Sequence, residues 1–240
     1  MIELEIDRLG HRGDGVATVN GRAVFVPYAL PGERVRATLA GDRADEVEIL
    51  TRSPDRADPP CPHFGICGGC LVQHLAPGPY ADFKRQLVVD ALADRGLTPP
   101  VEPTRTSPPN ARRRATFAGI LLGRQAVVGF HQRASHAVVD IDVCFVVTPT
   151  LLKAKPALQA LVSLIQPRKQ PIDLTVTESV AGPDIAVGKL PAKDLERLRL
   201  PLIQLAERFD LPRLSVGNEV IVERRPPVVR IDGIAVVPPP

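Results

Sequence analysis

Three cysteines fall close together in the segment Cys61-Pro-His-Phe-Gly-Ile-Cys67-Gly-Gly-Cys70, and this spacing constrains the fold more than any other feature of the chain. Three thiolates of one tight loop can face a single point, because the two glycines let the backbone wrap closely around it. A fourth cysteine, Cys144, lies 74 positions beyond Cys70 and would complete the shell. Four thiolates suit either a tetrahedral Zn²⁺ ion or a [4Fe–4S] cluster. The spacing predicts an inorganic centre held by Cys61, Cys67, Cys70 and Cys144, and it does not separate zinc from iron–sulfur.

Two other readings of the cysteines are weaker. The N-terminal sequence MIELEIDRLG has no basic region followed by an apolar core, so a secretory signal and hence disulfides are not expected. Cysteines that act as small buried hydrophobes remain an alternative, which fits Cys144 better than the array. His63 or His74 would serve as a zinc ligand only if one cysteine were not used. No stretch approaches the roughly 18 apolar residues of a membrane span, and the sequence predicts a cytoplasmic protein.

The hydrophobic and proline patterns predict three parts. Residues 1–52 alternate polar and apolar residues in short runs separated by turns such as Asn20-Gly21, which is typical of an OB-like β-barrel. Residues 53–100 hold the cysteine-rich loop and an amphipathic helix over 80–95. Residues 101–240 read as an α+β central domain. Its expected strands are 112–122, 126–131, 136–141, 172–180, 184–188, 212–216, 219–224 and 228–231, with helices at 148–166 and 191–208.

The arginines are unevenly distributed. Residues 103–139 contain six arginines, two histidines and no acidic residue, although the net charge of the whole chain is only +3. Since each guanidinium can fork onto a phosphate, this segment is a candidate polyanion-binding surface, with a solvated strand face as the alternative. The candidate polyanion contacts of this segment are Arg112, Arg113, Arg114, Arg124, His131 and Arg133.

Three stretches resemble the iron–sulfur RNA uracil-5-methyltransferases, bacterial enzymes that methylate uridines of 23S ribosomal RNA. Residues 9–17 and 24–33 resemble the TRAM domain of that family, an OB-like RNA-binding barrel. Residues 61–74 resemble its cluster loop. Residues 112–115 and 129–144 resemble its central domain, which supplies the fourth cysteine.

The resemblance implies that the four cysteines hold a [4Fe–4S] cluster and that the partner is RNA, ribosomal rather than transfer RNA. It also implies S-adenosylmethionine as cofactor, bound by a Rossmann-like domain that follows the central one in the family. The chain ends where that domain would begin, and it has neither a spare cysteine for a nucleophile nor a glycine-rich cofactor loop.

We therefore expect no Rossmann-like methyltransferase domain in this chain. It would be the RNA-binding and cluster-binding portion of such an enzyme, truncated, inactive alone and with no catalytic residue of its own. A separately encoded catalytic half is one possible partner. The alternative is a stand-alone RNA-binding adaptor with a structural zinc site. If helix 80–95 docks against the missing catalytic domain, Phe83, Leu87 and Ala91 will be incompletely buried in this chain.

Overall fold

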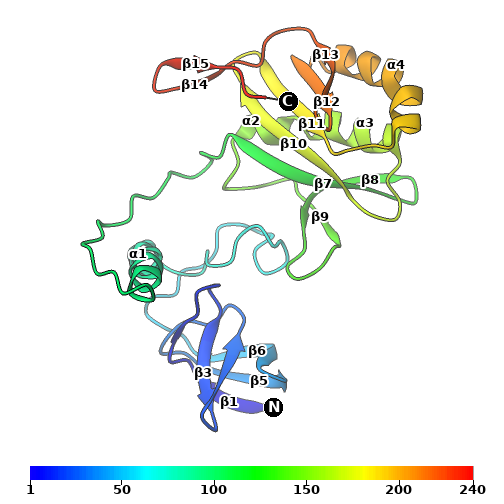
Figure 1. The fold of residues 1–240 in the computed structure, drawn as a ribbon. Helices are drawn as coiled ribbons and strands as arrows, with labels where there is room; N and C mark the ends of the chain where they lie inside the picture. The colour runs from blue at the N-terminus through cyan, green and yellow to red at the C-terminus, as the bar shows by residue number, and fades with distance from the viewer. Residues whose placement is uncertain (240) are drawn as a thin grey trace. The chain divides into compact units, whose positions relative to one another are not determined.

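The computed structural model describes residues 1–239, which form two compact units (Figure 1). The first unit comprises Met1–Gly65 and Cys70–Ser107, and the second comprises Ile66–Gly69 and the chain from Pro108 onward. In the part of the chain that the structure describes, no helix is long and apolar enough to cross a membrane. The three-part division expected from the sequence stays a prediction.

The first unit is built on a six-stranded sheet of order β1-β5-β6-β4-β3-β2. Apolar side chains alternate along the strands, so that residues such as Leu4, Val24 and Val35 are buried together in one core. Asn20 and Gly21 both adopt positive φ in the β3–β4 turn, as the Asn-Gly dipeptide predicts. The strands are β1 (Ile2–Glu5), β2 (Arg8–Leu9), β3 (Gly15–Val19), β4 (Arg22–Val26), β5 (Arg34–Ala40) and β6 (Arg43–Thr51).

A buried ion pair attaches the segment after β6 to this sheet. Glu33 is fully buried and accepts hydrogen bonds from Arg56 Nε and Nη2 at 2.6 and 2.8 Å. Its carboxylate also accepts the backbone N–H groups of Leu30 and Ser53. Burial raises the pKa of Glu33, but these hydrogen bonds outweigh burial, and the pKa lies below its ordinary value. Glu33 is therefore a carboxylate whose charge is fully compensated.

Helix α1 (Pro77–Ala93) has no buried residue. Phe83 and Leu87 are half-buried and Ala91 is exposed, so the expected incomplete burial of its apolar face is observed. The helix begins with Pro77, a residue suited to the first turn because its missing N–H has no partner there in any helix. The chain that follows α1 runs back along it, where Thr104 donates to the carbonyl of Ala81 at 2.8 Å.

The second unit is a seven-stranded sheet of order β13-β12-β11-β10-β7-β8-β9 with three helices packed on one face (Figure 1). Every strand pair is antiparallel except β11–β12, which α4 connects in parallel. The strands are β7 (Arg114–Leu122), β8 (Gln125–His131), β9 (Val138–Asp140), β10 (Ile172–Ser179), β11 (Gly182–Val187), β12 (Arg213–Val216) and β13 (Glu219–Glu223). The helices are α2 (Pro149–Lys153), α3 (Lys155–Ile165) and α4 (Ala192–Arg208), and a separate hairpin comprises β14 (Val229–Ile231) and β15 (Ile234–Val236).

This architecture differs from the α+β arrangement expected for residues 101–240. The two expected β-β-α stretches join in one continuous mixed sheet, because β10 pairs with β7 and thereby connects them. The helix expected at 148–166 is two helices, since Pro156 lies in the first turn of α3 and cannot continue α2. Strand β15 was not expected at all.

A second buried ion pair lies on the face of the sheet opposite the helices. Arg213 of β12 donates to both carboxylate oxygens of Asp184 on β11, at 2.9 and 2.7 Å, and both side chains are buried. Hydrogen bonding to Asp184 raises the pKa of Arg213. Arg213 also donates to the backbone carbonyls of Pro238 and Pro239, at 3.0 and 3.3 Å. One guanidinium thus joins the parallel strand pair to the last described residues.

We predict that Arg213→Met lowers the free energy of unfolding of the second unit by about 3–5 kcal/mol, because the substitution leaves Asp184 buried without its countercharge. Urea unfolding followed by circular dichroism measures this change. Arg197→Met is the matched control, since Arg197 is an exposed helix arginine in a surface pair with Asp194. Equal unfolding midpoints for the two variants would contradict the prediction.

Candidate functional site

The β8–β9 hairpin carries basic side chains at its tip. His131 ends β8, and its ring lies 6.3 Å from that of His136 in a perpendicular arrangement. The loop between the strands is closed by a hydrogen bond from Gln132 N–H to the carbonyl of Ala137 at 2.8 Å, and Ala134 adopts positive φ. His131 and His136 are exposed. The tip is an ordered turn that presents cationic and imidazole groups to solvent.

The centre of the cysteine array runs beside this tip. The N–H of Gly68 donates to the carbonyl of His131 at 2.9 Å, and the N–H of Arg133 donates to the carbonyl of Ile66 at 3.0 Å. Cys67 and Gln132 form an antiparallel bridge between these two bonds. Residues 66–69 therefore add a short strand-like segment to the hairpin, held by main-chain hydrogen bonds.

Gly68 permits this close approach. A Cβ atom at this position would lie 3.0 Å from the carbonyl oxygen of His131 and 3.3 Å from backbone atoms of Arg133. All these neighbours are backbone atoms, which cannot move aside as the end of a flexible side chain can. The glycine in this position of the C-x2-C motif is thus explained by packing against the hairpin.

The four cysteines are half-buried. The Sγ of Cys67 accepts the N–H of Gly69, and the Sγ of Cys144 accepts the N–H of Val146, each at 3.4 Å. Backbone N–H groups aimed at sulfur stabilise a thiolate, the form that ligates zinc or iron. Each of these two sulfurs thus has a backbone donor two residues further along its own loop.

Asn110 fixes the loop that carries Cys144. Its side-chain amide donates to the carbonyls of Cys144 and Val147, both at 2.9 Å, and its own N–H donates to the carbonyl of Phe145 at 3.0 Å. The residues just before Cys144 are held by Lys155, which donates to Asp140 at 2.7 Å and to Asp142 at 2.5 Å. Burial lowers the pKa of Lys155, but these two hydrogen bonds outweigh burial and raise it above its ordinary value. No local sequence pattern predicts either of these contacts, because both join residues far apart in the chain.

Among residues 1–239, no three cysteine, histidine or acidic side chains are grouped as a metal site. Cys61 and Cys70 belong to the first unit, and Cys67 and Cys144 belong to the second. His74 is fully buried and packs against the rings of Phe64 and Tyr28, with centroid distances of 5.4 and 6.0 Å. The four-cysteine ligand set therefore stays a proposal.

Three consecutive arginines, Arg112, Arg113 and Arg114, lie at the end of the sheet that also bears the tip of the β8–β9 hairpin. Arg114 is the first residue of β7. In the antiparallel β7–β8 pair Ala118 lies opposite Gly129, so the start of β7 lies beside the end of β8 at His131. All three arginines are exposed. Arg113 is engaged within the unit, where its guanidinium donates to the carbonyl of Arg230 at 2.8 Å. We call this group, comprising Arg112, Arg113, Arg114, His131 and Arg133, the basic end of the sheet.

Arg124 lies elsewhere. It is exposed in the β7–β8 turn, next to Gly123, whose φ is +61°. Strand β8 has seven residues, so its two ends are about 20 Å apart. The structure brings together five of the six predicted RNA contacts and places Arg124 at the opposite end of the same strand.

Several aromatic rings are packed within the protein. Phe117 is buried and stacks on Phe130 with their ring centroids 5.0 Å apart. Tyr28 packs edge-on against Phe64 at 5.1 Å. These rings contribute to cores rather than to an exposed stacking platform.

Comparison with known proteins identifies related chains. A model of the TRAM domain matches residues 1–42. An uncharacterized RNA methyltransferase of Agrobacterium fabrum is 39% identical over 98% of this chain and 58% of its own length. The 23S rRNA (uracil(1939)-C(5))-methyltransferase RlmD of Shewanella amazonensis is 31% identical over 97% of this chain and 56% of its own length. The chain is thus homologous to RNA uracil-5-methyltransferases, and it spans somewhat over half the length of these relatives.

One solved structure shares the fold. The Pyrococcus abyssi tRNA (uracil-54, C5)-methyltransferase, in complex with S-adenosyl-L-homocysteine, matches with a TM-score of 0.58 and 19% identity. The match covers 91% of this chain and 52% of that chain.

Two sequence-based predictions were wrong. The expected fold class was an OB-like barrel followed by an α+β central domain without a methyltransferase domain. The second unit is instead a seven-stranded mixed sheet with helices, and nearly the whole chain shares the fold of a methyltransferase.

The interpretation as a truncated RNA-binding and cluster-binding portion, with a zinc adaptor as the alternative, is overturned because RNA methyltransferases match along almost the entire chain. A separate catalytic half is likewise unsupported. Both predictions relied on the absence of two motifs, a spare cysteine nucleophile and a glycine-rich cofactor loop. The absence of a motif does not determine how strands pair.

We predict that Gly68→Val separates residues 66–69 from the hairpin, because the added side chain would collide with backbone atoms of His131 and Arg133. Amide hydrogen exchange of Gly68's replacement and of Arg133 should accelerate by about tenfold or more, since each hydrogen bond contributes roughly 1 kcal/mol or more. Gly78→Val is the control: nothing lies within 4 Å of a Cβ built at Gly78, in the first turn of α1. Unchanged exchange at Arg133 in Gly68→Val would disprove the proposed packing.

Proposed function

We propose that this protein acts in the S-adenosylmethionine-dependent methylation of carbon 5 of uracil in RNA, with 23S ribosomal RNA as the substrate. The proposal rests mainly on the relatives, which are RNA methyltransferases that align along almost the whole chain. The relatives named for a target act on 23S rRNA, and they are more similar in sequence than the tRNA enzyme that shares the fold. A cytoplasmic location is part of this proposal.

RNA would be held in part by the basic end of the sheet. Guanidinium groups contact two phosphate oxygens at once, and exposed imidazoles donate to phosphate or to base edges. The proposed contacts are Arg112, Arg113, Arg114, His131 and Arg133, with Arg124 as a separate contact at the far end of β8. The absence of acidic residues from 103–139 keeps this surface free of charges that repel phosphate.

We further propose that Cys61, Cys67, Cys70 and Cys144 hold a [4Fe–4S] cluster, with zinc as the alternative. The half-burial of all four thiols and the N–H groups directed at the sulfurs of Cys67 and Cys144 support this ligand set. A bound cluster would supply a covalent cross-link among the four cysteines. The residues of the chain would hold the loop: Gly68 through the hairpin and Asn110 through the Cys144 loop.

The function is tested in a strain that lacks this protein. We expect its 23S rRNA to lose one 5-methyluridine, measured by nuclease digestion and mass spectrometry, and the wild-type gene to restore it. Unchanged 5-methyluridine in both ribosomal and transfer RNA would overturn the proposal. Loss from transfer RNA alone would overturn the substrate assignment.

We predict that Arg112→Ala combined with Arg114→Ala weakens binding to an unmodified 23S rRNA fragment and reduces its salt dependence. Each lost phosphate contact should lower the slope of log affinity against log salt by roughly 0.7–0.9. Filter binding at several salt concentrations measures both effects. Arg197→Ala combined with Arg199→Ala, on the exposed side of α4, is the control for lost positive charge. The same slope in both double variants would exclude the basic end as an RNA contact.

We predict that the protein purified without oxygen absorbs broadly near roughly 400 nm, as thiolate-bound iron–sulfur clusters do. Cys144→Ser should reduce this absorption together with the iron content. A colourless protein that contains one zinc ion would favour the alternative, since zinc has no such absorption. A colourless protein without metal would exclude both.

A further inference from the structure

A hollow of about 670 Å³ opens in the first unit between two hairpin turns. One turn is β3–β4, with Asn20 and Arg22, and the other is β5–β6, with Gly41 and Asp42. The N–H of Phe25 donates to the carbonyl of Asp42 at 2.8 Å and fixes the second turn against β4. The volume lies within the range of small-ligand sites.

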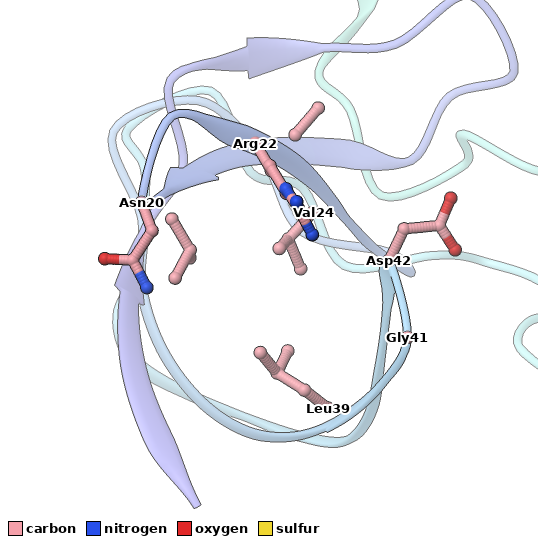
Figure 2. A pocket seen from close by; sticks show the side chains of 8 residues that line it. Asn20, Arg22, Val24, Leu39, Gly41 and Asp42 are labelled. Atoms are coloured by element: carbon pink, nitrogen blue, oxygen red, sulfur yellow. The ribbon is translucent and has the colours of Figure 1, made fainter.

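The lining of the hollow combines an apolar floor with separate polar groups. Val19, Ala23, Val24 and Leu39 supply the apolar surface. Leu39 is 41% exposed, a large value for a leucine that ends a buried strand pattern. Figure 2 shows Arg22 and Leu39 extending toward the centre from opposite sides, with Asn20 and Asp42 on the two flanks.

Arg22 differs from half of the other arginines of its unit in having no ion pair. Five others form ion pairs with carboxylates at 2.6–3.1 Å, namely Arg34 with Glu3, Arg36 with Glu48, Arg43 with Asp14, Arg52 with Asp58 and Arg56 with Glu33. Within the described residues, neither the Arg22 guanidinium nor the Asp42 carboxylate has a partner. The hollow thus has one unpaired cation beside its apolar floor and one unpaired anion on its flank. Figure 2 shows the Asp42 carboxylate turned away from the centre, and a change of side-chain rotamer would bring it to face the floor.

The charge of the surrounding unit makes this cation significant. Residues 1–60 contain 8 basic and 11 acidic side chains, so general electrostatic attraction does not bring a polyanion to this surface. A phosphate would bind here only at a guanidinium that is not already neutralised. Arg22 meets that requirement beside an apolar surface suited to a flat ring.

We infer that this hollow binds a single unpaired guanine nucleotide of an RNA strand. The base lies on the apolar floor, and Arg22 contacts the adjoining phosphate or stacks on the ring. The Asp42 carboxylate accepts the two adjacent N–H donors of guanine, N1–H and N2–H, in a bidentate pair. Uracil has one N–H donor between two carbonyl acceptors, so it cannot form that pair. The inference relies on the proposed function only for RNA as the partner.

The experiment titrates the ¹⁵N-labelled full chain with GMP, AMP and UMP and follows amide chemical shifts. We expect GMP to shift the amides of Val19, Val24, Leu39 and Gly41 and to bind about tenfold more tightly than UMP, the ratio expected for one bidentate pair. Asp42→Asn should remove the preference for GMP, and Arg22→Ala should weaken all three nucleotides about tenfold. Arg8→Ala is the matched control, since Arg8 is an exposed arginine of the same sheet outside the hollow.

The outcomes separate this inference from the proposed function. If GMP shifts no amide of the hollow, or if Arg8→Ala weakens binding as much as Arg22→Ala, the inference is overturned, whatever the methylation experiment shows. If UMP binds as tightly as GMP, the assignment of guanine is wrong. If GMP binds as expected but 5-methyluridine persists in the deletion strain, the proposed function fails and the nucleotide site stands.

Discussion

The buried pair of Glu33 and Arg56 is the interaction on which the arrangement of the first unit depends. It attaches the chain just after β6 to the core of the six-stranded sheet. That chain in turn pairs with the end of the cysteine loop, because Arg56 forms a bridge with Leu75 and the N–H of Ala57 donates to the carbonyl of His74. Both ends of the loop are thereby held next to one another on the sheet. A buried carboxylate tolerates this position only with its cation present, so the loop and the ion pair are structurally inseparable.

Between those ends, residues 66–69 belong to the second unit and follow its β8–β9 hairpin. The C-x5-C-x2-C array is therefore shaped by two different sets of contacts. Contacts within the first unit position the residues on either side, and main-chain hydrogen bonds to the hairpin position Cys67 and Gly68. The cysteine-rich segment consequently has a defined backbone path that does not rely on its sulfur atoms alone.

Local patterns predicted the elements well, but not how they combine. Alternating apolar residues located β3–β5 and β7–β12 to within a few residues, because side-chain period and turn residues are local properties. The pairing of β10 with β7, and hence the single mixed sheet, depends on contacts between residues about 60 positions apart, for which the sequence has no local signal. The same limit applies to the site. The acid-free segment indicated the basic residues, but only the strand register showed that Arg124 lies apart from the others. The unpaired state of Arg22 became visible only once the partners of its neighbours were known.

The contact between Gly68 and the hairpin uses backbone atoms on the hairpin side. A surface held through its main chain keeps its shape when its side chains are replaced. Mutation can therefore exchange His131, Arg133 or His136 without disturbing the segment that carries Cys67. In evolutionary terms, the side chains of this hairpin can vary while the backbone beneath them is inherited unchanged.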